Sequence, residues 1–216
     1  PHLTKEDNPM PRGSAEKRIE GLLDRAEIFY LVRFERLCHD INDWDGLVGS
    51  YLPGSPVRTT WFDGTIEEFA EASKAKMAAG SIAKHRVFPA KLHQRGGRAI
   101  CESPGYISDR LTAEGVEFDV MAHVRFHSRV VLTDIGWRLN SFEGIYESDS
   151  VLPVNPADTP PIDWNLVNAM RPSYRFLGFC QAHRNYDVSQ ELLGDDRPDL
   201  LEAFYAAERK WGDTGE

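Results

Sequence analysis

The sequence predicts an α+β fold in which helices lie on one face of a curved antiparallel sheet. Two observations lead to this prediction. Helix-forming patterns are concentrated in the first 80 residues, whereas residues 82–147 alternate strand-like runs with turn sequences. Strands that follow one another through tight turns pair antiparallel, so this second region is expected to form a meander.

Three helices are expected before the long strands. Ser14 is a good N-cap for the first, which continues to about Asp40 and is apolar over more than one face, so we expect it to be sandwiched between other elements. A second, short helix covers residues 44–52. The third follows Thr65, with apolar side chains at helical spacing, and stops at Gly80.

The strands are predicted from β-branched and aromatic runs bounded by turn residues. A short strand is expected between the second and third helices, at residues 57–62. Prolines and glycines inside the later runs fit sheet edges or bends. The long strands of the meander are expected at residues 82–94, 98–110, 116–132 and 137–147.

The 216 residues divide into three parts. Residues 1–13 carry prolines and charges without an apolar period, which predicts a loose arm. Residues 14–150 form the domain. Residues 151–216 open with a proline-rich linker pattern and include a last helix from about Asp196, but they have few aliphatic positions. This extension cannot hold a core of its own, so we expect it to pack on the domain or on a partner subunit.

Composition excludes several classes of protein. The formal net charge of −9 is the wrong sign for binding nucleic acid. No apolar run approaches the roughly 18 residues of a membrane span, and the N-terminus lacks a signal-peptide core, so a soluble, cytoplasmic protein is expected. The three cysteines, Cys38, Cys101 and Cys180, are far apart and support neither a disulfide framework nor a zinc site.

Four motifs, in this order, resemble the SnoaL-like branch of the nuclear-transport-factor-2-like superfamily. In the stretch 26–52 a helix ends in Asp40, and Trp44-Asp45 follow after three residues. The resemblance covers about residues 14–147. The other three motifs are the strand-turn-helix entry at Gly64 to Phe69, His85 near the start of a long strand, and the turn Asp134, Gly136, Trp137.

The resemblance implies a cone, in which a highly curved antiparallel sheet is closed by three helices around an apolar pocket. It also implies that Asp40 and His85 form a catalytic dyad, as in scytalone dehydratase and hexachlorocyclohexane dehydrochlorinase. A carboxylate bonded to one imidazole nitrogen fixes the tautomer and leaves the other nitrogen free to take a proton. From the residues alone, Asp40 could instead cap the turn before Trp44, and His85 could be a satisfied core histidine.

The function expected from this resemblance is that of a cofactor-independent lyase. His85 would remove a proton, followed by dehydration or by retro-aldol release of a small aldehyde such as formaldehyde, from a small aromatic substrate, for example a lignin-derived one. No metal is expected, and a homodimer or higher homo-oligomer is a family expectation. The alternatives are an isomerase or cyclase acting through an enolate, and a non-catalytic ligand-binding module.

Further pocket residues are expected on the segments that line the cone in this family, although alternation alone cannot assign their faces. Tyr106 could donate a proton in place of the second catalytic histidine of scytalone dehydratase, or could be ordinary strand packing. His39 is expected either to form a polar wall of the pocket or, as the residue pattern favours, to face solvent. The predicted substrate-binding residues are Tyr51, Arg58, Trp61, Phe88, Tyr106 and Asn140.

His123 and His127 suggest a metal site, but residues four apart on a strand are separated by roughly 13 Å and cannot share an ion. They alternate with apolar residues and are expected on the outer face of the sheet, together with Arg125 and Arg129. We expect that face to make a dimer contact or to be covered by residues 151–216.

Overall fold

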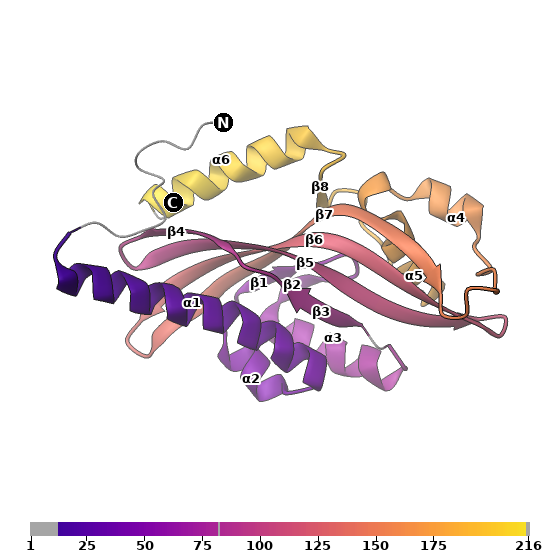
Figure 1. Cartoon of the computed structure of the whole chain (residues 1–216), viewed down its shortest axis with the longest axis horizontal. Helices are drawn as coiled ribbons and strands as arrows, with labels where there is room; N and C mark the ends of the chain where they lie inside the picture. Colours follow the sequence, from indigo (N-terminus) through magenta and orange to yellow (C-terminus); the bar gives the residue numbers. More distant parts are fainter. Residues whose placement is uncertain (1–12, 82, 215–216) are drawn as a thin grey trace.

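The computed structural model describes residues 13–81 and 83–214, and its fold confirms the predicted α+β class. Figure 1 shows a long, curved, unclosed sheet with α1, α2 and α3 on one face and α6 on the other. None of the helices in these described residues is both long and apolar enough to span a membrane. The predicted arm at residues 1–13 lies, except for Gly13, outside the described residues.

Three long strands form the centre of the sheet. β5 (Arg98–Ala113), β6 (Val116–Thr133) and β7 (Gly136–Pro153) pair as an antiparallel meander. The path across the sheet is β2-β1-β7-β6-β5-β3, with β4 also paired to β5 and β8 to β7. The short strands are β1 (Pro56–Arg58), β2 (Asp63–Thr65), β3 (Lys84–Val87), β4 (Lys91–Arg95) and β8 (Leu193–Gly194).

The strand expected at residues 82–94 is two strands, β3 and β4, separated by Phe88–Ala90. Pro89 lies in this gap, and a proline has no N–H to give to a sheet ladder. Both strands pair with β5, so the break turns the chain without detaching it from the sheet.

Two register shifts curve the sheet. They lie between His123 and Val124 and between Arg129 and Val130, where β7 has an extra residue opposite β6. Such bulges bend a strand and switch which side chains face the core. On β7 the core side chains are accordingly Trp137 and Leu139 before the second shift, and Phe142 and Tyr146 after it.

The three N-terminal helices are α1 (Ala15–Ile41), α2 (Trp44–Gly49) and α3 (Ile66–Ala78). The Ser14 side chain caps α1, and Asn42 ends it in a left-handed conformation with φ 66°. Thr65 and Glu68 form a capping box at α3. The C-cap at Asn42 ends α1 at Ile41 and leaves Asp40 in its last turn, where it binds His85 on β3.

The expectation that the first helix is sandwiched was wrong for the chain as described. One face of α1 packs in the core through Ile28, Leu31 and Val32. The opposite face leaves Tyr30 and Ile41 more than half exposed. The apolar pattern is wide because this helix carries apolar side chains on both faces, and only one of them is covered in the monomer.

The C-terminal extension packs on both faces of the sheet. α5 (Arg175–His183) contacts β5, β6 and β7, and Asp149 on β7 accepts hydrogen bonds from its backbone N–H groups at Phe176 and Leu177. α6 (Pro198–Thr214) crosses the outer face, where Glu208 binds Arg129. The remaining elements are α4 (Trp164–Ala169) and the 3-10 helix η2 (Pro172–Tyr174).

The outer-face residues follow the predicted alternation. His127 is fully buried beneath α6, with its ring 4.8 Å from that of Phe204, and Arg125 binds Asp195. His123 is exposed. The extension therefore covers most of this polar face.

We expect Gly105→Ala to destabilise the fold. A Cβ at Gly105 would lie 2.0 Å from the backbone oxygen of Arg86 and 2.7 Å from Phe126, so β3 would have to move. Overpacking of this kind costs about 1–3 kcal/mol, measurable by urea denaturation. Gly49→Ala is the matched control, because nothing lies within 4 Å of its Cβ position. Equal stability of both variants would contradict the close approach of β3 to β5.

Candidate active site

A cavity lies between the sheet and the helices. Its walls come from the end of α1, the segment after β1, α3, β3, the middle of β5 to β7, and α5. Its volume is about 40 Å³, which corresponds to about three water molecules by the same measure. The cavity therefore suits a small ligand, and a larger group would require its side chains to move. No Asp or Glu lines it among the described residues.

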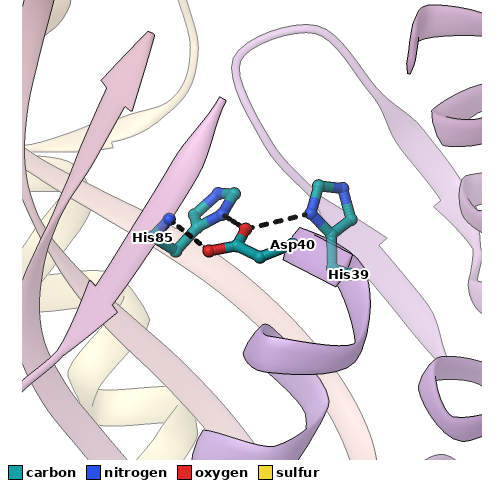
Figure 2. A group of neighbouring side chains, drawn as sticks. All are labelled: His39, Asp40 and His85. Carbon is teal, nitrogen blue, oxygen red and sulfur yellow. Dashed lines mark hydrogen bonds and ion pairs between the residues drawn. The ribbon is translucent and has the colours of Figure 1, made fainter. Parts of the chain in front are cut away.

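His85 lines one wall of this cavity, and Asp40, which is not itself a lining residue, binds it. His85 lies on β3, and its Nδ1 is 2.7 Å from Oδ1 of Asp40. The backbone N–H of His85 donates to Oδ2 of the same carboxylate, also at 2.7 Å. Figure 2 shows the carboxylate held by these two contacts, with Asp40 reaching from the end of α1. The two segments, 45 residues apart in the chain, are thereby fixed to each other.

The electrostatics favour a neutral histidine beside a charged carboxylate. Burial raises the pKa of Asp40, but its contacts with His39 and His85 outweigh burial and hold the pKa well below the ordinary value. Burial is the main reason that the pKa of His85 is lowered; Asp40 opposes this shift, and Arg36 and Lys76 add to it. With Asp40 ionised, Nδ1 of His85 carries the proton and Nε2 is the basic atom.

His39 forms a polar wall of the cavity, so the prediction that it faces solvent was wrong. Its side chain is buried, and its ring stacks on Phe69 with centroids 5.5 Å apart. Nδ1 lies 3.6 Å from Oδ1 of Asp40 (Figure 2), beyond hydrogen-bond distance, and has no hydrogen-bond partner. Burial lowers the pKa of His39 to about 4, so the ring is neutral at pH 7.

His39, Asp40 and His85 also have the spacing of a metal site, since one ligand atom from each lies within 4.8 Å of the others. Their bonding fits a metal poorly. Both carboxylate oxygens already accept hydrogen bonds from His85. Arg86 Nη1 lies 3.8 Å from Oδ2 and would repel a divalent cation. The arrangement is that of a hydrogen-bonded dyad of Asp40 and His85.

Of the six predicted substrate-binding residues, Trp61 lines the cavity. Its ring packs against Phe69 and Tyr186, at centroid distances of 5.6 Å and 5.5 Å. Tyr186 belongs to the C-terminal extension. Trp61 therefore joins the segment after β1, α3 and the extension at one side of the cavity.

Tyr51 and Arg58 are not among the residues that line this cavity. Tyr51 is buried under α1, where its hydroxyl donates to Glu35 Oε1 at 2.8 Å. Arg58 reaches the sheet edge, and its Nη2 donates to the backbone oxygen of Glu191 at 3.1 Å. Their side chains hold a helix and the extension in place.

Phe88, Tyr106 and Asn140 do not line this cavity either. Phe88 is 47% exposed and its ring meets Tyr106, at 5.9 Å, away from the cavity. Tyr106 precedes Ile107, which does line the cavity, and successive strand residues point to opposite faces. Asn140 is the extra residue of the second bulge and has no register partner. The sequence alone could not show where a bulge shifts the alternation of inward-facing and outward-facing side chains along β7.

The sequence analysis missed several cavity residues. Ser73 and Lys76 lie on the buried face of α3, together with Ile66 and Phe69. Two polar side chains within the apolar face of a predicted helix indicate a polar site inside the core, and this pattern could have identified both residues. Gln181 comes from α5, and no local pattern linked it to the cavity.

The fold and the site together define a class of protein: a curved sheet covered by helices, with a buried histidine-aspartate pair facing a small cavity. The chain belongs to the SnoaL-like domain family, whose model matches residues 20–143. Pea pathogenicity protein 2 of Fusarium vanettenii is 32% identical over 163 residues, covering 74% of this chain and 70% of its own length.

Two solved structures have similar folds. A type 2 hexachlorocyclohexane dehydrochlorinase covers 67% of this chain and 99% of its own length, with a TM-score of 0.56 and 11% identity. A protein of Novosphingobium aromaticivorans proposed to be a scytalone dehydratase covers 64% and 96%, with a TM-score of 0.50 and 15% identity. At these identities the likeness concerns the fold alone. The match to the family model confirms the predicted resemblance to SnoaL-like proteins.

Proposed function

We propose that the protein is a cofactor-independent lyase in which His85 removes a proton from a small oxygenated substrate and Asp40 orients it. One observation carries the proposal: the 2.7 Å contact between Nδ1 of His85, which lines the cavity, and Oδ1 of the buried Asp40 carboxylate. A neutral imidazole held in one tautomer by a carboxylate is suited to general base catalysis.

His85 can act first as the base and then as the acid in either reaction. In a dehydration, Nε2 takes a proton from carbon, the electron pair forms a C=C bond, and the departing hydroxyl leaves as water with the proton that His85 returns. In a retro-aldol cleavage, Nε2 takes a hydroxyl proton, a C=O bond forms and a C–C bond breaks. Formaldehyde then leaves, and His85 returns the proton to the carbanion. The cavity of about 40 Å³ favours the smallest substrates, and a substrate with one aromatic ring enters only if lining side chains move.

An isomerase or cyclase that uses a carboxylate base fits this cavity less well. Asp40 is engaged by two hydrogen bonds from His85, and no Asp or Glu is among the described lining residues. A non-catalytic binding module would not require a neutral histidine oriented by a charged carboxylate. Both alternatives are separated from the lyase by the substrate test below.

The test is incubation with a panel of small aryl diols and hydroxy carbonyl compounds, with formaldehyde and water loss followed by mass spectrometry. Turnover by the wild-type protein is expected to fall by about 10²–10⁴-fold in His85→Ala, the usual contribution of a general base. His123→Ala is the matched control, since His123 is exposed on the outer sheet face. Undiminished turnover in His85→Ala would remove this residue from the mechanism, and turnover should survive treatment with a chelator.

A further inference from the structure

Lys76 is a second reactive group in the same cavity. It lies on the buried face of α3 with only 6% of its surface exposed. Its Nζ donates to Gln181 Oε1 at 2.8 Å and lies 4.1 Å from the ring centroid of Trp61 and 5.2 Å from that of Tyr186. The amine is thus held by one amide and two aromatic faces, an arrangement that suits a cation.

Lys76 has no carboxylate within 4.0 Å among the described residues, although buried charges in proteins are normally paired. The charged side chains around it have partners of their own. Asp109 is bound by Arg184 through two nitrogens, one at 3.0 Å. Arg36, on the other side of the cavity, is bound by Glu35. The cavity therefore has a cation whose anionic partner is missing.

A second, independent observation points to a ligand. Four buried polar atoms without a hydrogen-bond partner belong to residues that line this cavity, and buried polar groups are rarely left so. One of them, Ser73 Oγ, lies on α3 one turn before Lys76. A ligand with several oxygens would satisfy them. The four atoms are Thr59 Oγ1, Ser73 Oγ, Ser81 Oγ and His39 Nδ1.

We propose that Lys76 is a catalytic residue that binds the substrate oxygen on which negative charge develops when His85 removes a proton. This inference rests on the proposed function and adds the substrate class: a β-hydroxy carbonyl compound with further oxygens for Ser73 and Ser81. His85 takes the proton α to the carbonyl, and the electron pair moves onto the oxygen held by Lys76. The enolate then re-forms the C=O bond, a C=C bond forms between the α and β carbons as the β C–O bond breaks, and the departing hydroxyl leaves as water with the proton that His85 returns.

The charge state of Lys76 agrees with this role. Burial lowers its pKa to about 7, with Asp109 opposing that shift and Arg184 adding to it. A substantial fraction of the side chain is therefore ammonium at neutral pH, and a bound anion would raise that fraction. The groups that face His85 are Asp40, His39, Arg36 and Lys76 itself, so removal of the Lys76 charge should also make His85 easier to protonate.

The test measures binding and does not depend on turnover. Mononitrophenols report their ionisation by visible absorbance, and the wild-type protein is expected to bind the phenolate, lowering the pKa of the bound phenol. In Lys76→Met, which keeps the length of the side chain without its charge, phenolate affinity should fall by about 10–100-fold. Lys74→Met is the matched control, because Lys74 is on the same helix but its side chain is 42% exposed and paired with Glu71. Lys76→Arg should retain part of the binding.

Two results would overturn the inference: Lys76→Met binding nitrophenolate as tightly as the wild type, or cyanoborohydride trapping a substrate carbonyl covalently on Lys76, which would make it a nucleophile. If both proposals hold, His85→Gln should lose turnover and keep phenolate binding. If His85→Gln kept turnover, the proposed role of His85 as the base would fail, and the phenolate result for Lys76 would stand separately. Lys76→Met removes one hydrogen-bond donor to the substrate oxyanion, so its kcat is expected to fall by about 10²–10³-fold.

Discussion

Asp40→Asn is expected to lower kcat by about 10²–10⁴-fold while the fold is retained. The asparagine oxygen can still accept the hydrogen bond from the His85 backbone N–H, which now binds Oδ2. Its amide group would then face Nδ1 of His85 and donate to it. The proton of the imidazole would move to Nε2, the atom that must accept the substrate proton, so the histidine would be held in the wrong tautomer.

The measurement is kcat on the best substrate from the aryl diol and hydroxy carbonyl panel, with circular dichroism to check the fold. Asp45→Asn is the matched control, because Asp45 is an exposed aspartate in the first turn of α2. If Asp40→Asn turned over substrate as fast as Asp45→Asn, the dyad would have no catalytic role.

The pH profile of the wild type gives an independent check of the same dyad. His85 must be neutral to act as a base, and burial lowers its pKa below the ordinary 6.5. Activity should therefore be retained down to pH 6.5 and lost only as the pH falls further, through the lowered pKa. An acid limb centred above pH 6.5 would contradict the assignment of His85 as the base.

Glu35→Ala is expected to destabilise the protein by about 3–5 kcal/mol, because it leaves a buried charge without its partner. Glu35 and Arg36 are 1% and 3% exposed, and they bind each other beneath α1. The Arg36 guanidinium also lies 4.4 Å from the ring centroid of Phe142 at the cavity wall. Loss of Glu35 would leave Arg36 charged in the core, and the cavity would lose the arginine's fixed position.

Urea denaturation measures this effect, and Tyr51→Phe is the matched control. Tyr51 donates to the same carboxylate, but its loss removes one hydrogen bond and leaves the ion pair intact. The control should cost about 1–2 kcal/mol. If the two variants were equally stable, the free energy of unfolding would not depend on the Glu35–Arg36 pair.

Much of the fold and part of the site follow from local sequence. The caps at Ser14 and Thr65 and the stop near Gly80 bound α1 and α3 closely, because capping depends on residues within one turn. The meander follows from strand and turn patterns of the same local kind. Asp40 and His85 were found through motifs that resemble a family, and the structure places them 2.7 Å apart.

The sequence by itself determined the α+β class, the order of elements and the family. The tertiary structure decided which side chains reach the cavity. Tyr106 and Asn140 lie outside it because strand parity and a bulge set their faces, and a bulge is a property of two paired strands. Lys76 and Gln181 meet across 105 residues only when α5 docks on the sheet. That docking depends on long-range contacts such as Arg184 with Asp109, which no local pattern encodes.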